Sequence, residues 1–516
     1  MLTPFVPEPY VDFTQDQPRR RMLAALKAVG DQLGQRYSLW INGEPVTTSN
    51  WINSISPGAT DRVVGQVAKA GAQQADQAIR LAADRFKFWS GVHPEERALV
   101  LAKAAAIMRQ RIYELSAWQC YEVSKPWSEA YADVCEAIDF CEFYAREMIQ
   151  LQGRHSTTPF PGEDNAVRYI PLGVVGIISP WNFPLAICMG MTVAALVAGN
   201  TVVLKPSSDA PVIAAKMYDI LAQAGLPPGV LNFVPGSGGD VGATIVDHPL
   251  TRMIAFTGSR DVGAGINERA AKVHQGQIWI KRVILEMGGK NGILVDETAD
   301  LAAAADAVVA SAFGLQGQKC SACSRLVAHA DVYDDLLQRV VQRSRKLTIG
   351  DTVAGENYTM GGVINQAAYD SINDYIKVGK GEGRLILGET KTPSGGYFIP
   401  PTVIADVDPH ARIAQEEIFG PVLAVIKARD FDDGLRIIND TPYGLTGALF
   451  STHRQRLHRA GSEFHVGNLY LNRQCTGALV GVQPFGGFNM SGTNSKAGGP
   501  DYIPLFLQAK SITERL

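Results

Sequence analysis

Three short motifs in this 516-residue sequence carry side chains that could perform acyl transfer. Cys320 lies in Gly-Gln-Lys-Cys-Ser-Ala-Cys after a long Ala-rich helical pattern, Glu286 ends one apolar run, and Asn182 follows another. A thiolate attacks a carbonyl carbon, a carboxylate can take a proton from water, and a fixed amide can stabilise an oxyanion. We therefore expect a site in which Cys320 forms a covalent acyl intermediate beside Asn182 and Glu286.

Cys320 needs an activating environment, because a free cysteine is only a few per cent thiolate near neutral pH. A helix terminus or a bound cationic nicotinamide ring could supply the positive potential. The alternative interpretations are an incidental thiol and a redox or metal pair with Cys323, although a lone CxxC is a weak signal. Asn182 could equally be a turn-former and Glu286 an ordinary strand-end carboxylate. Only the three motifs together favour chemistry.

Two glycine-containing turns are candidate phosphate sites. Phe256-Thr257-Gly258-Ser259 joins a predicted strand to a predicted helix that contains Val262. Helix N-termini present unpaired N–H groups to anions. Gly236-Ser237-Gly238-Gly239 forms a similar turn, but its spacing departs from GxGxxG. Each turn alone is as consistent with a structural role as with a functional one.

The motifs sit at the ends of strands in two regions where predicted strands and helices alternate, which is typical of parallel sheets with crossover helices. Such sheets bind ligands at the carboxyl ends of their strands. In the first region the predicted strands are 174–178, 201–204, 230–234 and 253–256, and the predicted helices are 184–198, 211–224 and 239–247. In the second they are strands 292–295, 325–328, 422–426, 448–451 and 466–471.

Other segments are predicted to surround these sheets. Helical periodicity over 75–89, 94–119 and 127–150 predicts helices packed around the first sheet. The segment 156–169 and the tail from Ser491 are polar and fit neither region, so we expect them to form a flap for subunit contact.

Composition and charge narrow the partners. Lys and Arg total 48 against 51 for Asp and Glu, so the net charge of −3 gives no reason to expect nucleic acid or an anionic membrane. Residues 1–13 include Glu8 and Asp12 and no apolar core, which argues against a targeting peptide and favours a cytoplasmic location. The apolar stretch 185–199 is shorter than the roughly 20 residues that span a bilayer, so it predicts a buried helix. Reduced thiols are expected, with packing roles for Cys120, Cys135, Cys141, Cys188 and Cys475.

Seven motifs resemble the aldehyde dehydrogenase superfamily in identity and order over residues 168–492: PWNFP, KPSS, FTGS, EMGGK, GQKC, EEIFGP and PFGGF. Three longer segments at 317–325, 463–473 and 476–494 resemble the L-glutamate γ-semialdehyde dehydrogenases within it. The resemblance implies an α/β fold with a Rossmann-type cofactor domain, an α/β catalytic domain and a β oligomerisation flap. The expected boundaries are an N-terminal arm at 1–38, the dinucleotide-binding domain at 39–155 and 172–287, the flap at 156–171 and 491–516, and the catalytic domain at 288–490.

The resemblance also implies roles for individual residues. Cys320 would be the nucleophile, Asn182 the oxyanion donor and Glu286 the base. The implied cofactor contacts are Ser179, Pro180, Trp181, Lys205, Ser208, Gly238, Gly242, Phe256, Thr257, Gly258, Ser259, Val262, Glu417 and Phe419. The implied substrate contacts are Ser321, Gly477 and Ala478 for an α-carboxylate, and Phe183 and Phe488 for the aliphatic part. NAD is the expected cofactor, with NADP also plausible because Ser208 replaces a carboxylate that would repel a 2′-phosphate; no metal is expected.

These roles predict oxidation of L-glutamate γ-semialdehyde, which arises from 1-pyrroline-5-carboxylate, to L-glutamate during proline breakdown. The expected partners are a small-molecule substrate and further copies of the chain, as a homodimer or a larger dimer-based assembly. Three alternatives stay open: a different aldehyde, acyl transfer to coenzyme A, and a catalytically silent scaffold. Glu286 disfavours the second, and the joint presence of Cys320, Glu286, Asn182 and Glu417 disfavours the third.

Overall fold

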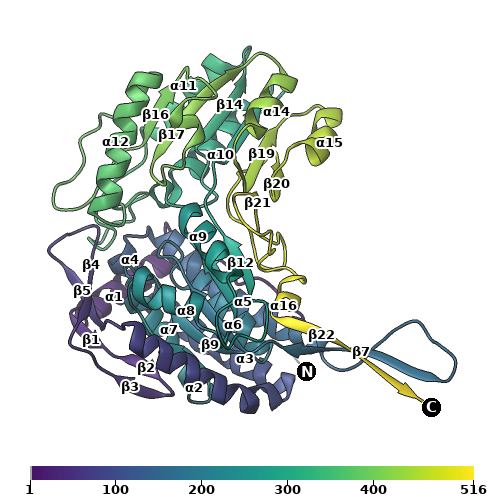
Figure 1. The fold of residues 1–516 in the computed structure, drawn as a ribbon. Coiled ribbons are helices and arrows are strands. Elements are labelled where there is room, and N and C mark those ends of the chain that lie inside the picture. The colour runs from purple at the N-terminus through teal and green to yellow at the C-terminus, as the bar shows by residue number, and fades with distance from the viewer. Residues whose placement is uncertain (1–2) are drawn as a thin grey trace.

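The computed structural model describes residues 3–516; Met1 and Leu2, which begin the predicted N-terminal arm, lie outside them. Two α/β bodies lie one above the other, and a long two-stranded arm projects from the side of the lower one (Figure 1). The arm consists of β7 (Glu163–Pro171) and β22 (Leu507–Arg515).

The first sheet has seven strands in the order β12-β11-β8-β9-β10-β2-β3. Strands β8 to β12 are mutually parallel, so their carboxyl ends lie along one edge. The four predicted strands are confirmed, whereas the antiparallel pair β2–β3 was not anticipated. The bounds are β2 Leu39–Ile41, β3 Glu44–Val46, β8 Val174–Ile178, β9 Thr201–Lys205, β10 Leu231–Phe233, β11 Thr251–Thr257 and β12 Arg282–Glu286.

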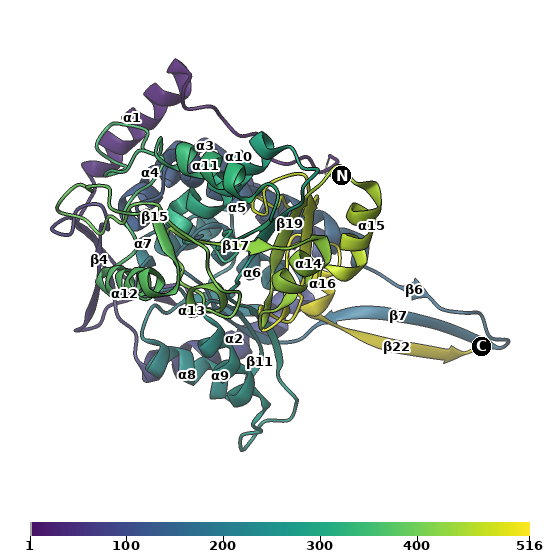
Figure 2. The same cartoon turned by 90° about the horizontal axis from the view of Figure 1, so that it is seen from above.

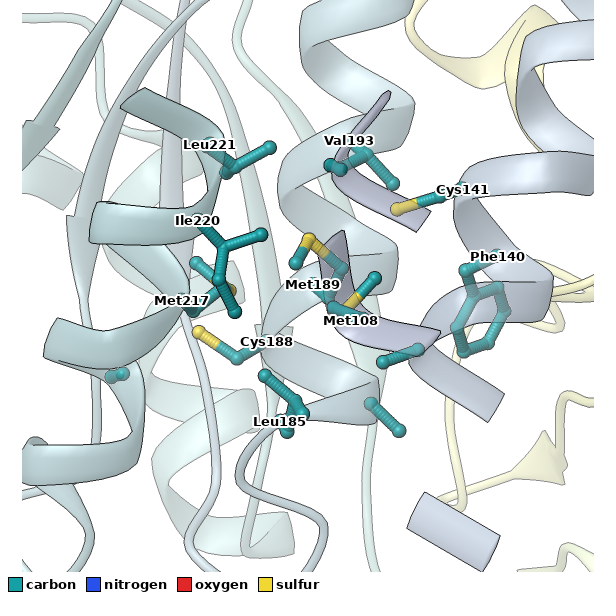
Figure 3. Packing of buried hydrophobic residues seen from close by; sticks show 14 of the residues in the cluster. Met108, Phe140, Cys141, Leu185, Cys188, Met189, Val193, Met217, Ile220 and Leu221 are labelled. Atoms are coloured by element: carbon teal, nitrogen blue, oxygen red, sulfur yellow. The ribbon is translucent and has the colours of Figure 1, made fainter. Parts of the chain in front are cut away.

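Helices cover this sheet and form the largest core. The predicted buried helix is α6, and its Cys188, Met189 and Val193 pack between α7 and α5 (Figure 3). The helix expected over 94–119 is instead two helices, which break at Arg111 where φ and ψ leave the helical region. No helix within residues 3–516 is long and apolar enough to cross a membrane. The bounds are α2 Ala72–Gly91, α3 Pro94–Gln110, α4 Ile112–Val123, α5 Trp127–Leu151, α6 Ala186–Val197, α7 Pro211–Gln223, α8 Ala243–Asp247 and α9 Arg260–Ala271.

The second sheet also has seven strands, in the order β15-β16-β17-β14-β13-β19-β20, and only the β15–β16 pair is antiparallel. Alternate residues face opposite cores: Ile293 and Val295 pack with α10 and α11, while Leu294 packs with α12 and α14. The five predicted strands are confirmed; β15 and β16 were missed. The bounds are β13 Gly292–Val295, β14 Arg325–His329, β15 Arg384–Leu387, β16 Thr402–Ala405, β17 Val422–Ala428, β19 Thr446–Phe450, β20 Asn468–Leu471, α10 Leu301–Phe313, α11 Tyr333–Ser344, α12 Gln366–Glu382, α14 Phe431–Asn439 and α15 Arg454–Glu463.

Smaller elements complete the chain. Helix α1 buries Met22, Leu26 and Val29 in the core that contains α4, and neither it nor the sheet β1-β5-β4 was anticipated. The bounds are α1 Asp16–Gly30, β1 Gln35–Tyr37, β4 Trp51–Ile55, β5 Val63–Ala68, β6 His155–Ser156, α13 Arg412–Gln415, β18 Tyr443–Gly444, β21 Phe488–Asn489 and α16 Tyr502–Leu505.

The projecting arm is formed by segments that are far apart in sequence. β22 pairs antiparallel with β7 from Leu507↔Pro171 to Arg515↔Glu163, and β6 pairs with the other side of β7. The arm extends away from both bodies (Figure 2). Residues 491–506, which we expected in the flap, lie against the body instead. The Ser495 hydroxyl donates a hydrogen bond to Glu286, and Phe506 is buried in the largest core.

Candidate active site

A cavity of about 370 Å³ brings several predicted site residues together. Its walls come from α5, α6, the end of β12, the loop after α10 and the segment 474–485. Seven predicted residues line it: Cys320, Glu286, Ser321, Gly477, Ala478, Phe183 and Thr257. The nucleophile, the base and the expected carboxylate anchor therefore share one cavity, although 34 residues separate Glu286 from Cys320 along the chain and more than 150 separate Ser321 from Gly477.

The loop that carries Cys320 is backbone-strained and tightly held. Leu315, Gln316 and Gly317 have positive φ values of 51°, 55° and 68°. The Gln316 side chain donates to the carbonyls of Ser124 (3.2 Å) and Gly362 (3.0 Å), across to two other segments. Left-handed conformations of residues other than glycine persist where the surroundings hold them, and they cluster at functional sites.

Asn182 supports this loop directly. Its Nδ2 donates to the Gln318 carbonyl at 3.0 Å, and the residue is buried. One of its two amide hydrogens is used in this bond. Asn182 is not among the residues that line the cavity. Asn291, which the sequence analysis missed, donates to the carbonyls of Cys320 (2.7 Å) and Ala322 (2.9 Å). Its only sequence signal is its position directly after the EMGGK motif.

The Cys320 thiol is not activated by a helix N-terminus, contrary to one expectation. It follows the C-terminal end of α10, where the helix dipole is negative. Burial, together with the nearby carboxylates of Glu417 and Glu286, raises the pKa of Cys320 to about 12. In this environment the resting thiol is protonated at neutral pH.

Cys323 does not share the cavity with Cys320. It is buried in the second body, and its thiol donates to the Arg325 carbonyl at 3.4 Å. Cys475 is buried too, and its thiol donates to the Ser321 carbonyl at 3.6 Å. The thiol of Cys475 thus packs behind the residue expected to hold the substrate carboxylate.

Glu286 ends β12 and has one bonded and one free oxygen. Its Oε1 accepts a hydrogen bond from Ser495 Oγ at 2.5 Å, and its buried Oε2 has no partner among the described residues. Burial raises the pKa of Glu286 to about 7, even though the hydrogen bonds from Ser495 oppose this rise. A carboxyl group with a pKa near 7 can exchange protons with water at neutral pH, as a general base must. Ser495 was missed because it lies 209 residues from Glu286.

Lys205 and Ser208 lie at the carboxyl edge of the first sheet. Lys205 ends β9, and its Nζ donates to the Pro206 carbonyl at 3.0 Å. Burial lowers the pKa of Lys205 to about 8. Ser208 Oγ donates to the Gly236 carbonyl at 3.5 Å, which joins it to the neighbouring glycine turn. Ser179, at the end of β8, donates its N–H to the Lys205 carbonyl (3.2 Å), and Pro180 follows it.

Two turns border this edge. Gly238–Gly242 forms a short π-helical turn capped by Ser237, and a Cβ at Gly238 would meet no atom within 4 Å. Gly242 lies beside the Lys205 side chain. Phe256 and Thr257 end β11, and Gly258 follows them. Ser259 is the N-cap residue of the 12-residue helix α9, but its side chain makes no capping hydrogen bond. Val262 on α9 is exposed.

The second body supplies the remaining cofactor candidates. Glu417 Oε1 accepts the Gly289 N–H at 2.9 Å, and a Cβ at Gly288 would overlap the Glu417 carboxylate. Phe419 has φ 55°, and its ring meets the Trp181 ring edge-on at 5.5 Å. The two bodies together supply hydrogen-bond donors and a carboxylate for a ribose, a free helix N-terminus and open glycine turns. These groups fit a dinucleotide bound at the carboxyl edge of the first sheet.

One of the two predicted aromatic contacts is misplaced. Phe183 lines the cavity, with Lys125 Nζ 4.1 Å from its ring centroid. Phe488 lies in β21, and its ring packs on His465 at 5.0 Å. Phe485 lines the cavity instead. PFGGF contains two phenylalanines, and β21 pairs with β18, which places Phe488 elsewhere.

Helix α5 contributes a wall that the sequence analysis did not assign. Every fourth residue lines the cavity, as the 3.6-residue helical period allows: Ser128, Ala132, Glu136, Phe140 and Tyr144. Burial, together with the charge of Asp133, raises the pKa of Glu136 to about 8. Glu129 also lines the cavity and forms an ion pair with Lys319 at 2.6 Å. Acidic groups thus face the cavity alongside the segment 474–485.

Comparison with known proteins agrees with this arrangement. The family model described as aldehyde dehydrogenase family matches residues 40–512. A 1-pyrroline-5-carboxylate dehydrogenase of Geobacillus sp. (strain WCH70) is 57% identical over 514 residues and covers all of both chains. The crystal structure of 1-pyrroline-5-carboxylate dehydrogenase from Thermus with bound NAD is 50% identical, with a TM-score of 0.98 over all of both chains. Proline utilization A from Bdellovibrio bacteriovorus is 44% identical with a TM-score of 0.97, covering 99% of this chain and 53% of that one. This chain has the aldehyde dehydrogenase fold and belongs to the aldehyde dehydrogenase family.

Proposed function

We propose that this chain oxidises L-glutamate γ-semialdehyde, formed by hydrolytic opening of 1-pyrroline-5-carboxylate, to L-glutamate with NAD or NADP. The observation that carries this proposal is the single cavity in which Cys320 and Glu286 meet Ser321 and the Gly477–Ala478 pair. The cavity combines a nucleophile and a base with hydroxyl and backbone N–H donors that can bind a carboxylate. This combination suits an aldehyde that also bears a carboxylate. The names of the relatives at 50–57% identity support the same substrate.

Cys320 loses its thiol proton to water, and the thiolate sulfur then bonds to the aldehyde carbon. The negative charge that develops on the carbonyl oxygen is stabilised by the second Nδ2 hydrogen of Asn182 and by a backbone N–H. Lys205, Ser208, Ser259, Glu417 and Phe419 would hold a nicotinamide dinucleotide, which would supply the acceptor for the hydride that leaves the aldehyde carbon. The acyl group then remains on Cys320 as a thioester.

Glu286 completes the reaction by taking a proton from the water that attacks the thioester. Glu286 lines the same cavity, and its buried Oε2 has no hydrogen-bond partner among the described residues. The pKa of about 7 leaves a large ionised fraction of Glu286 at neutral pH. Water releases L-glutamate and regenerates the thiol. A buried base in this position supports hydrolysis over transfer to coenzyme A.

The cavity walls match the remaining groups of the substrate. Ser321, Gly477 and Ala478 hold the α-carboxylate, and Gly477 is fixed because Arg473 donates to its carbonyl at 3.1 Å. Phe183 and Phe485 contact the aliphatic chain. The Glu136 carboxylate accepts a hydrogen bond from the ammonium group of the substrate. Burial raises the pKa of Glu136, and the positive charge of the ammonium group would oppose this rise and favour the ionised carboxylate.

Steady-state kinetics tests the proposal. The expected result is a kcat/KM for glutamate γ-semialdehyde well above that for simple aliphatic aldehydes, measured with NAD and NADP in turn. A preference for simple aldehydes would reject the substrate. Thioester product in the presence of coenzyme A would reject hydrolysis.

We further propose that the chain forms a homodimer, or a larger assembly of dimers, in the cytoplasm. β22 is an edge strand of the sheet β22-β7-β6, and an edge strand has unpaired N–H and C=O groups that a second copy can use. Free thiols throughout the described chain suit a reducing compartment.

A further inference from the structure

The segment 3–13, called the strap below, runs along helix α5 before the chain enters α1. It is extended and crosses the molecule from the N-terminal end toward α1 (Figure 2). Its contacts with α5 follow an antiparallel order, since α5 numbers fall as strap numbers rise. The pairs are Thr3 with Arg146, Phe5 with Phe143, Glu8 with Asp139, Pro9 with Cys135, and Phe13 with Tyr131.

These contacts fix the strap firmly. Arg146 Nε donates to the Thr3 carbonyl at 2.7 Å, and the Glu8 N–H donates to Asp139 Oδ1 at 2.8 Å. Arg109 Nε also donates to the Glu8 carboxylate at 2.8 Å. The strap is therefore held by backbone and side-chain bonds at several points along its length.

The strap lies next to the substrate cavity. The α5 residues that hold it occupy the helix face adjacent to the one that lines the cavity. On its other side, the strap contacts the segment 474–485 through Gly481. The Phe5 ring lies so close to Gly481 that a Cβ added to this glycine would be 2.8 Å from the ring. The strap thus bridges two walls of the cavity, α5 and the segment that holds Gly477 and Ala478.

Tyr10 is the strap residue that lines the cavity itself. It is 57% exposed, so it lies where the cavity meets solvent. Cys320, where the aldehyde carbon reacts, lines the same cavity. An aldehyde bound at Cys320 that is too long for the cavity would have to pass the Tyr10 ring to reach solvent.

We propose that Tyr10 is a specificity-determining residue that limits the length of aldehyde the cavity accepts. The ring closes the mouth against longer chains and keeps a short substrate in place. The identity of that substrate rests on the proposed function, whereas the effect on chain length requires only aldehyde oxidation.

The experiment measures kcat and KM for glutamate γ-semialdehyde, butanal and octanal at saturating NAD. Tyr10→Ala should raise the octanal-to-butanal ratio of kcat/KM by roughly tenfold, the scale on which an apolar pocket discriminates small differences in size. It should also raise KM for the semialdehyde while kcat and KM for NAD stay as in the wild type. Tyr10→Phe, which keeps the ring, and Val6→Ala, at a strap position 73% exposed, should behave as the wild type.

A second variant guards against a folding artefact. Phe5→Ala leaves Tyr10 intact but loosens the strap, so it should raise the octanal-to-butanal ratio in the same direction. An unchanged ratio in Tyr10→Ala overturns the proposal, as does a uniform loss for all three aldehydes with a raised KM for NAD. If the wild type does not turn over the semialdehyde, the substrate assignment fails, while the two alkanals still test Tyr10.

Discussion

At the scale of single residues, Glu286 carries the hydrolytic half of the proposed reaction. Glu286→Gln should release about one NADH per subunit in a burst, because acylation persists, and then turn over roughly 10²- to 10⁴-fold more slowly. The variant also loses a negative charge that raises the pKa of Cys320, so iodoacetamide should alkylate Cys320 faster than in the wild type. Stopped-flow absorbance and mass spectrometry measure both effects. Unchanged steady-state turnover would assign the base to another group; Glu297→Gln is the control at a partly exposed carboxylate.

Ser495 sets the pH at which Glu286 works. Its hydroxyl donates to the carboxylate, so it favours the ionised form and lowers the pKa of Glu286. Ser495→Ala should therefore raise this pKa above about 7. The limb of the pH–kcat profile that rises with pH should move to higher pH, with the deficit largest below neutrality and recovered under alkaline conditions. An acid shift, or an equal loss at every pH, contradicts this role.

At the scale of elements, the buried Glu122 at the end of α4 holds the N-terminus of α7. Its carboxylate accepts the N–H groups of Val212 (2.7 Å) and Ile213 (2.8 Å) and the Ser54 hydroxyl (2.9 Å). Glu122→Gln turns one acceptor into a donor and should cost about 1–3 kcal/mol of stability. Because α7 begins three residues after Ser208, KM for NAD should rise more than KM for the aldehyde.

Thermal unfolding and initial-rate kinetics check this prediction. Glu114→Gln is the matched control on the same helix, since it removes only a partly exposed ion pair with Arg111 and should cost no more than about 1 kcal/mol. A Glu122→Gln protein as stable as the control would show that the cap does not hold α7.

At the scale of the whole molecule, the arm determines assembly in our proposal. Removal of residues 508–516 deletes most of β22 but leaves Phe506 and Leu507 in the core. Multi-angle light scattering should then give the mass of a monomer, whereas the full chain gives a dimer or a multiple of it. An unchanged mass would locate the interface elsewhere. A monomeric full-length chain would reject the assembly itself.

The elements that carry the motifs could be predicted because their signals are local. Apolar runs such as 174–178 and 292–295 are read from neighbouring residues, and parallel pairing then brings Lys205, Thr257 and Glu286 to one edge. Helix α1 was missed, and so were the strand pairs β2–β3 and β15–β16, each of which lies at one end of its sheet. Strand β16 is one example, because it directly follows Pro400 and Pro401, and consecutive prolines indicate a turn or loop.

The sequence alone determined the chemistry available to this protein, because the identity of Cys320, Glu286 and Asn182 and their positions after apolar runs are local properties. Tertiary structure decided which residues surround them. Ser495 meets Glu286, Phe485 lines the cavity in place of Phe488, and Tyr10 reaches the cavity mouth. Such contacts depend on how distant segments pack, and no local pattern specifies the partner of a side chain 209 residues away.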